Sequence, residues 1–249
     1  MGAVADGSPL VEGRPYTWLP SSRGAVQPVV RLRSAVCLLG RFPALAGVDL
    51  DVAPGEVVLL SGGNGAGKTT LLRLITGLVP LHRGEAEVLG HDLRRDRRSH
   101  RRELALVGHE TFCYDDLTVR ENLRFASRAS GGDDAMADAA AERMGLARLG
   151  AVLHGKLSAG QRRRLALAVA LARDPALLLL DEPHAGLDAE GRVALDALLS
   201  AAAAEGRTVL IASHELDRAR ALATREVVLT GGQAHGTLTP ESAPQPASV

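Results

Sequence analysis

A glycine-rich run that ends in a lysine and two threonines is the stretch of this sequence best suited to chemistry. The pattern G-x-x-x-x-G-K-T spans Gly62–Thr69. Glycines let a chain turn tightly and bring its backbone N–H groups close to an anion, because no side chain stands in the way. Lys68 can reach the outer phosphates of a nucleotide, and the hydroxyl of Thr69 can bind Mg²⁺. The residues expected around the phosphates are Gly62, Gly63, Asn64, Gly65, Ala66, Gly67, Lys68, Thr69 and Thr70.

The alternative interpretation of this run is a glycine-rich turn before an ordinary helix. Its context argues against that alternative, because the apolar run Val57–Leu60 precedes the loop as a strand and residues 71–75 follow as the apolar face of a helix. Lysine also occurs only at positions 68 and 156 of an arginine-rich chain, so a chance match would more often carry arginine. Strand, loop and helix in this order are the setting that a phosphate-binding loop requires.

Two acidic residues and a histidine form a second candidate group, at the ends of two further apolar runs. Asp181 and Glu182 follow four leucines, and His214 follows the run 208–213. A carboxylate at the end of a buried strand is costly unless a positive charge meets it, and Mg²⁺ bound jointly by Asp181 and Thr69 supplies that charge. Glu182 is the candidate general base, and His214 the candidate donor to the γ-phosphate; with Lys68 they make up the predicted catalytic set. The plainer alternatives are a carboxylate that caps the next turn and a structural histidine.

Strands and helices alternate along most of the chain, which predicts an α/β fold with a mostly parallel core sheet covered on both faces. Ligands in such folds bind at the C-terminal ends of the strands, where the phosphate loop, Asp181–Glu182 and His214 all lie by this interpretation. Partial alternation over residues 29–39 and 44–52 predicts an antiparallel β subdomain. The alanine-rich segment from about 110 to 160 predicts a helical subdomain inserted into the core.

The two ends of the chain differ in composition from the rest. Residues 1–28 are rich in Gly, Pro, Ser and Ala without periodicity and are predicted to be a disordered leader. The domain itself is expected over residues 29–232, and residues 233–249 are predicted to form a flexible tail.

Composition narrows the classes of partner. The 249 residues carry 29 basic and 29 acidic side chains, and only 2% of them are aromatic, so no nucleic-acid partner is expected. The two cysteines are far apart and favour a reducing compartment over a disulfide framework. No apolar run approaches the ~18–20 residues that span a bilayer, and no signal peptide is evident. If the protein works at a membrane, we expect another subunit to supply the span.

The segment LSAGQ at residues 157–161 completes a set of motifs that resembles the ATP-binding cassette (ABC) ATPases. The set comprises GGNGAGKTT, LSAGQ, LLLLDEP, AGLD and ASHE, in the family's order over roughly residues 29–232. The resemblance implies a P-loop NTPase fold that binds ATP and Mg²⁺ and works as a homodimer or pseudo-dimer. In such a dimer Ser158, Gly160 and Gln161 would contact the ATP held by the other protomer, and Asp188 would lie at the dimer seam.

Within the family, VGHETFCYDDLTVRENLRF and KLSAGQRRRLALA resemble the ATPase of bacterial haem exporters of cytochrome c maturation. That resemblance implies a peripheral subunit on the cytoplasmic face of the plasma membrane that powers a separate permease. A drug- or lipid-type exporter ATPase is one alternative, and a soluble ABC ATPase without a transport role is another. A regulatory module with impaired hydrolysis is disfavoured by the presence of Glu182 and His214.

Three positions depart from the family pattern. The loop glutamine that contacts Mg²⁺ is replaced, by Glu110 in one alignment and by His109 in an ungapped one. The aromatic residue that stacks on adenine is expected near Leu39–Gly40; Phe42 is a substitute, and Leu39 or Val48 would give only apolar contact. His184 stands where the family often has Thr or Phe, and the sequence assigns it no role.

Overall fold

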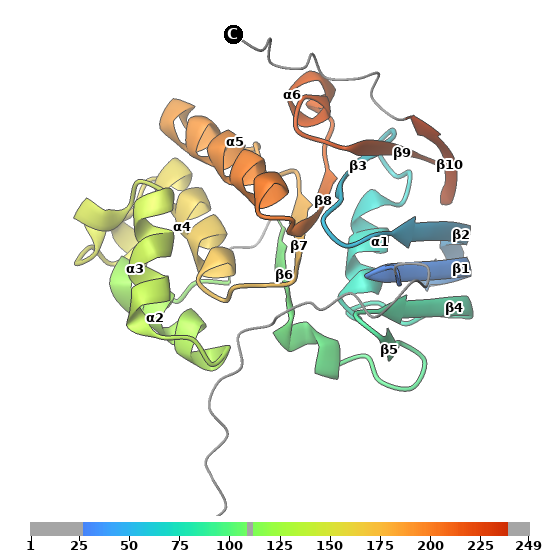
Figure 1. Ribbon diagram of the computed structural model, residues 1–249, viewed down its shortest axis with the longest axis horizontal. Coiled ribbons are helices and arrows are strands. Elements are labelled where there is room, and N and C mark those ends of the chain that lie inside the picture. The colour runs from blue at the N-terminus through green and yellow to red at the C-terminus, as the bar shows by residue number, and fades with distance from the viewer. Residues whose placement is uncertain (1–26, 109–111, 239–249) are drawn as a thin grey trace, which may run out of the picture.

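The structure, a computed structural model, describes residues 27–108 and 112–238, and in this part the strands form two sheets (Figure 1). The first is antiparallel, with strand order β2-β1-β4-β5. It consists of β1 (Val30–Leu39), β2 (Phe42–Val52), β4 (Arg83–Val88) and β5 (His91–Asp92). The second has the order β10-β9-β3-β8-β7-β6. It consists of β3 (Val57–Ser61), β6 (Leu104–Val107), β7 (Leu177–Asp181), β8 (Thr208–Ala212), β9 (Arg225–Thr230) and β10 (Gln233–Leu238).

The second sheet is parallel from β9 to β6, so the predicted α/β class and mostly parallel core are confirmed. Its central strands β3 and β8 are buried along their whole length and mostly apolar, because both faces of the sheet are covered. Val58 and Leu60 pack with α1 (Lys68–Ile75) and the antiparallel sheet, whereas Val57, Val209 and Ile211 pack with the helices of the opposite side. The sheet therefore separates two hydrophobic clusters.

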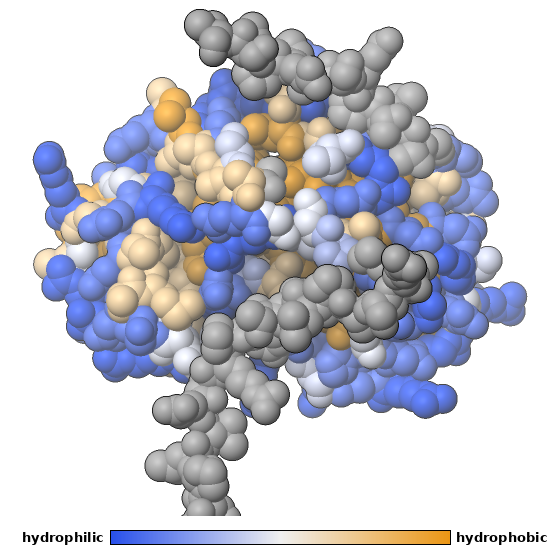
Figure 2. Space-filling view, viewed as in Figure 1, coloured by the Kyte–Doolittle hydropathy of each residue, from blue (hydrophilic) through white to orange (hydrophobic). Residues whose placement is uncertain are grey.

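The opposite face carries a group of helices, which Figure 1 shows on the left of the sheet. They are α2 (Val119–Ala129), α3 (Asp134–Arg143), α4 (Ala159–Leu171) and α5 (Ala189–Ala204), with 3₁₀ turns η2 (Ala147–Leu149) and η3 (His154–Lys156) between α3 and α4. A short α6 (Leu216–Arg220) follows β8, and a 3₁₀ turn η1 (Ser99–Arg102) precedes β6. In Figure 2 the alanine-rich helices present pale apolar surface, while the charged antiparallel sheet is mostly blue.

The start of α2 illustrates how local sequence sets these boundaries. Thr118 accepts a hydrogen bond from the backbone N–H of Glu121, and the Glu121 carboxylate accepts one from the N–H of Thr118. This reciprocal capping box satisfies donors that a helix N-terminus leaves unpaired. Thr118 and Glu121 together therefore fix where α2 begins.

The predicted flexible tail is wrong for its first residues, because Gln233–Leu238 form β10, which pairs antiparallel with β9. The glycines before it belong to a turn that also reaches β2, where the Ala46 N–H donates to the Gly232 carbonyl at 2.7 Å. Hydrogen bonds to β9 and β2 therefore order residues 232–238, although their composition alone predicted a flexible tail. The predicted leader, by contrast, lies almost wholly outside the described residues.

None of the helices in the described ranges combines the length and apolar character that crossing a bilayer demands.

Candidate active site

The glycine-rich loop joins the C-terminal end of β3 to α1 and packs closely against the backbone of β9 and β2. Gly62 has a φ of 137°, and a Cβ there would lie 2.2 Å from the carbonyl oxygen of Leu229. Gly67, which caps α1 with a φ of 106°, would place a Cβ 2.8 Å from the carbonyl oxygen of Ala44. Both positions therefore need glycine for conformation and for space. The loop is held between β9 and β2, which fixes its backbone.

Lys68 is the first residue of α1, and it is only 9% exposed because its side chain lies against the loop. Its Nζ donates to the carbonyl of Gly62 at 2.6 Å and to that of Gly63 at 3.2 Å. The first turn of α1 has neither a side-chain cap nor an acidic residue. An uncapped helix N-terminus with an ammonium group beside it favours an anion, because the N–H groups and the helix dipole add to the lysine charge.

The acidic pair comes from β7, two strands away from β3 in the sheet. Asp181 ends β7, and the backbone N–H of Glu182 donates to the Ala212 carbonyl of β8 at 2.8 Å. Glu182 has a φ of 48°, a left-handed conformation that is uncommon for a residue with a side chain. Such strain persists only where the surrounding structure holds it, and it gathers at functional sites.

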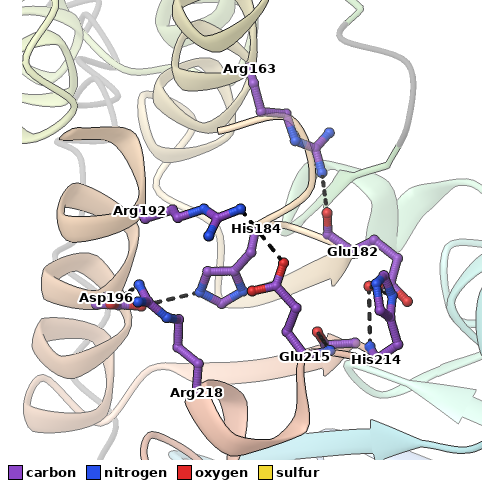
Figure 3. Close-up of polar contacts among 9 residues, drawn as sticks. Arg163, Glu182, His184, Arg192, Asp196, His214, Glu215 and Arg218 are labelled. Atoms are coloured by element: carbon purple, nitrogen blue, oxygen red, sulfur yellow. Dashed lines mark hydrogen bonds and ion pairs between the residues drawn. The ribbon is translucent and has the colours of Figure 1, made fainter. Parts of the chain in front are cut away.

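Glu182 and His214, which the sequence predicted to act together, are in direct contact (Figure 3). The Nδ1 atom of His214 lies 2.8 Å from Oε2 of Glu182, and the His214 backbone N–H donates to the same oxygen at 3.2 Å. The Glu182 side chain is 31% exposed and that of His214 is 66% exposed. Since β8 lies between β3 and β7, both residues stand at the sheet edge where the phosphate loop also begins.

Arg163 on α4 is a residue of this site that the sequence analysis missed. It is buried, and its Nη2 donates to the carbonyls of Asp181 at 3.2 Å and Glu182 at 2.9 Å, while Nη1 donates to that of Gly108. Burial lowers the pKa of Arg163, and the charge of Asp181 opposes that shift. The available signal was the run of three arginines at 162–164 on a helix whose remaining residues are mostly apolar.

The LSAGQ segment forms the start of α4, with Ser158 as its N-cap. The Ser158 hydroxyl oxygen accepts from the Gln161 N–H at 3.2 Å, and the Gln161 side-chain oxygen accepts from the Ser158 N–H at 2.9 Å. A Cβ at Gly160 would lie 3.0 Å from Oδ2 of Asp188. Asp188 in turn accepts from the N–H of Gly191 at 2.8 Å and so caps α5.

This segment is not brought to the phosphate loop of its own chain. In the ranges 27–108 and 112–238, no hydrogen bond or ion pair joins Ser158, Gly160 or Gln161 to residues 62–70. Ser158 is exposed, and Asp188 pairs with the buried Arg164 at 3.4 Å. The structure thus gathers Lys68, Asp181, Glu182 and His214 at one edge and leaves the LSAGQ segment apart from them.

Comparison with known proteins decides the family. The sequence profile described as ABC transporter matches residues 45–185. The chain belongs to the ABC transporter family. This ABC ATPase is 39% identical over 206 residues to the cytochrome c biogenesis ATP-binding export protein CcmA 1 of Salmonella paratyphi A, covering 83% of the chain and 99% of that relative. It is 40% identical over 185 residues to the CcmA protein of Bordetella bronchiseptica, covering 74% and 83% of the two chains.

Solved structures agree with this assignment. The ATP-binding subunit of an ABC transporter superposes with a TM-score of 0.79 at 27% identity, covering 85% of this chain and 90% of that one. A dimeric ATP-binding cassette in a post-hydrolysis state, bound to ADP and Pi, superposes with a TM-score of 0.77 at 25% identity, covering 86% and 100%. The chain is therefore an ATP-binding, ATP-hydrolysing subunit of an ABC transporter, a family whose cassettes dimerise and act with membrane permeases.

Two expectations for this cassette, the residue that contacts adenine and the residue at the loop-glutamine position, depend on single positions. Val48 is fully buried, so it offers no surface to adenine, whereas Phe42 is 80% exposed and Leu39 52% exposed, and the two are paired at the tip of the β1–β2 hairpin. Glu110 and His109, the two candidates for the loop-glutamine position, lie outside the described residues.

Proposed function

We propose that this ABC ATPase hydrolyses ATP at the sheet edge formed by β3, β8 and β7, with Glu182 as the general base. The observation that carries the proposal is the 2.8 Å contact between Glu182 Oε2 and His214 Nδ1, beside the strand that leads to Lys68. A carboxylate placed there can orient a water and accept its proton as the water attacks the γ-phosphate. His214, whose side chain is mostly exposed, can turn toward the γ-phosphate and donate to it.

The residues at this edge also fit Mg²⁺. The ion favours oxygen donors and usually binds through one or two protein groups together with phosphates and waters. Thr69 and Asp181 offer such oxygens, and the described residues contain no cluster of three or more His, Cys, Asp or Glu that would form a closed protein cage. When bound, Mg²⁺ neutralises charge on the β- and γ-phosphates. Lys68 would bind those phosphates directly, and Glu110 stays a predicted third contact to the metal or its water.

A second copy of the chain would complete the site. Ser158 is exposed at the start of an α-helix, a position that suits phosphate binding, and within the described part of the chain none of its hydrogen bonds reaches the phosphate loop. In a head-to-tail dimer Ser158 and Gly160 would contact the γ-phosphate held by Lys68 of the other copy, and Asp188 would lie close to the seam. ATP would then close the dimer, and hydrolysis would release it.

A groove lined by residues of β6 and α4 suits the docking of a permease. It has a volume of about 320 Å³, a mostly apolar lining that includes Leu78, Val169 and Phe112, and Arg101 and Arg173 at its polar positions. Phe112 is 67% exposed, and Tyr114 and Phe125 stack edge to face nearby at 5.3 Å, each 53% exposed. In a chain with so few aromatic residues, exposed aromatic side chains are typical of a contact surface.

The cargo that we propose follows from the relatives. Proteins named as cytochrome c biogenesis export ATPases match this chain over most of their own length, so we infer export for cytochrome c maturation, with haem as the candidate substrate. The chain would then be a peripheral subunit on the cytoplasmic face of the plasma membrane. Phospholipid export is the second candidate, because a cassette of human phospholipid-transporting ATPase ABCA7 is 36% identical over 198 residues.

The substitution Glu182→Gln tests the catalytic assignment. We expect ATP turnover to fall by roughly 10²- to 10⁴-fold, because an amide cannot accept the proton. ATP binding is expected to persist, so that size-exclusion chromatography with ATP and Mg²⁺ detects a dimer. A variant that hydrolyses ATP at the wild-type rate would overturn the assignment of Glu182.

Affinity purification of the tagged chain from its native membranes tests the partner. Recovery of an integral-membrane permease, together with haem-stimulated ATPase activity of the complex, is the expected result. Stimulation by phospholipid and not by haem would favour the second candidate instead. Failure of Phe112→Ala to reduce permease recovery would overturn the docking surface while leaving the ATPase assignment intact.

A further inference from the structure

A buried histidine lies in the turn that directly follows Glu182. The Ala185 N–H donates to the Glu182 carbonyl at 3.1 Å, and the Leu187 N–H donates to that of His184 at 3.3 Å, so the chain folds back here. The His184 side chain is only 1% exposed. It points away from His214 and toward α5, as Figure 3 shows.

His184 makes one side-chain hydrogen bond in the described structure. Its Nε2 atom lies 3.1 Å from Oδ1 of Asp196 on α5, and because an ionised carboxylate only accepts hydrogen bonds, Nε2 carries the proton. Its Nδ1 atom is buried without a partner among the described residues, which is destabilising. A leucine or phenylalanine would fill this space without that loss. What the imidazole adds to the site is therefore its bond to Asp196.

Asp196 reaches the other catalytic segment at the same time. Its Oδ2 atom accepts from Nη1 of Arg218 on α6 at 2.8 Å, four residues after His214. One turn earlier on α5, Arg192 lies 4.0 Å from the carboxylate of Glu215, the residue next to His214. A single face of α5 thus contacts the turn after Glu182 and the chain after His214 (Figure 3).

We propose that His184 is a positioning residue for ATP hydrolysis, which acts through Asp196 to hold the Glu182 turn in register with the His214 segment. The inference rests on the proposed roles of Glu182 and His214. Glu182 keeps a left-handed φ of 48°, so its turn needs support on more than one side. Arg163 holds the carbonyl of Glu182 from α4, and His184 anchors the turn to α5. A displacement of about 1 Å at such a site can cost on the order of 10²-fold in rate.

Two substitutions in the full chain separate positioning from packing. His184→Phe keeps an aromatic ring but cannot donate to Asp196, whereas the side-chain amide of His184→Gln can donate from nearly the position of Nε2. We expect His184→Phe to lower kcat roughly tenfold. The KM for ATP should stay within about twofold, because Lys68, which is expected to bind the phosphates, follows β3 and does not lie in the turn after β7. We expect His184→Gln to recover kcat to within about threefold of the wild type. His82→Phe, at an exposed histidine before β4, is the matched control and should match the wild type.

Several results would overturn the proposal. They are an unchanged kcat in His184→Phe, an equal loss in His184→Phe and His184→Gln, or an effect on KM alone. If His184→Phe does not fold, Arg218→Met takes its place, because Arg218 is 42% exposed and its replacement is better tolerated. This substitution removes the ion pair between Asp196 and the segment after His214. That variant should lower kcat about threefold at constant KM, and an unchanged kcat would again overturn the proposal.

Glu182→Gln is measured in parallel to separate this inference from the proposed function. If Glu182→Gln retains turnover, the catalytic assignment fails and the positioning role fails with it. If Glu182→Gln is inactive while His184→Phe matches the wild type, only the positioning role fails.

Discussion

Two regions of this ABC ATPase carry nucleotide-binding motifs, and they are built in opposite ways. Asp181, Glu182 and His214 stand at or just after the ends of neighbouring parallel strands, which the ladder hydrogen bonds of one buried sheet fix, and Lys68 begins the helix after the loop from the adjacent β3. The LSAGQ segment stands at the start of α4, where Ser158 is exposed and its hydrogen bonds stay within its own capping box. The first region is assembled by a single chain. The second is exposed and apart from the phosphate loop of its own chain, which is consistent with our proposal that it serves a second copy.

Arg163 connects the two regions directly, whereas Asp188 connects the second region to α5. Arg163 extends from the LSAGQ helix to the carbonyls of Asp181 and Glu182, and Asp188 contacts both Gly160 and the start of α5. A movement of α4 would therefore shift Arg163 and, through its hydrogen bonds to the backbone, displace Glu182. Substitutions in each region can test their separation, and a substitution at Arg163 can test this connection.

The largest effect is expected from Lys68→Ala in the first region. We expect ATP affinity to fall about a hundredfold or more, because charge-assisted hydrogen bonds to phosphate contribute about 1.5–3 kcal/mol each. Titration with a fluorescent ATP analogue measures the change. Lys156→Ala, at the other lysine of the chain and next to the second region, is the matched control and should bind ATP like the wild-type monomer. Equal losses in both variants would contradict the assignment of the two regions.

A mixing experiment tests whether the second region serves another copy. Ser158→Arg and Glu182→Gln should each be inactive alone, with turnover reduced by about 10² or more. In a mixed dimer, one site combines an intact Glu182 with an intact Ser158, so an equal mixture should recover about a quarter of wild-type turnover. Steady-state ATPase assays of the mixture provide the measurement. No recovery at any ratio would mean that each chain completes its own site.

Arg163→Met probes the connection between the regions. The methionine keeps much of the aliphatic stem but leaves three carbonyls without their donor, so we expect the free energy of unfolding to fall by about 2–3 kcal/mol. We also expect kcat to fall roughly tenfold, because the Glu182 turn loses its support from α4. Urea denaturation and ATPase assays measure both. The neighbouring Arg162→Met is the control, and equal behaviour of the two variants would remove Arg163 from the site.

The smallest expected effect is a loss of stability at acidic pH, caused by a buried histidine beside the C-terminal end of α1. His100 is fully buried with Nε2 at 2.9 Å from the Ile75 carbonyl. Burial lowers the pKa of His100 below the ordinary 6.5; the hydrogen bond to Ile75 and the charge of Asp96 oppose this shift, and His91 and Arg101 add to it. Below pH 6.5 the unfolded chain therefore binds this proton more readily than the folded one, so the contribution of His100 to stability is complete above pH 6.5 and is lost as the pH falls.

Thermal unfolding at pH 7.5 and pH 5.5 measures this loss. His100→Gln can still donate to Ile75 but does not titrate in this range. Its melting temperature should fall less on acidification than that of the wild type, by a few degrees. An identical fall in both proteins would show that another group accounts for the acid sensitivity.

Much of the fold could be predicted because its signals are local. The leucines of β7, the apolar run of β3 and the capping box at Thr118 each specify an element through neighbours in the chain. The order of these elements then predicts a parallel sheet. Gln233–Leu238 could not be predicted in this way, because their order comes from pairing with β9 and from the contact of the preceding turn with β2.

For the candidate active site, the amino-acid sequence by itself predicted the groups to which we assign the chemistry: the phosphate loop with Lys68, the acids Asp181 and Glu182, and His214. Residue type and spacing are enough for this prediction, because such groups directly after a buried strand are typical of a nucleotide-binding site. Only the tertiary structure decided that Arg163 supports Glu182, that His184 reaches Asp196, and that Val48 is buried. These contacts depend on which faces of helices and strands far apart in the sequence pack together, and local sequence patterns do not predict that packing.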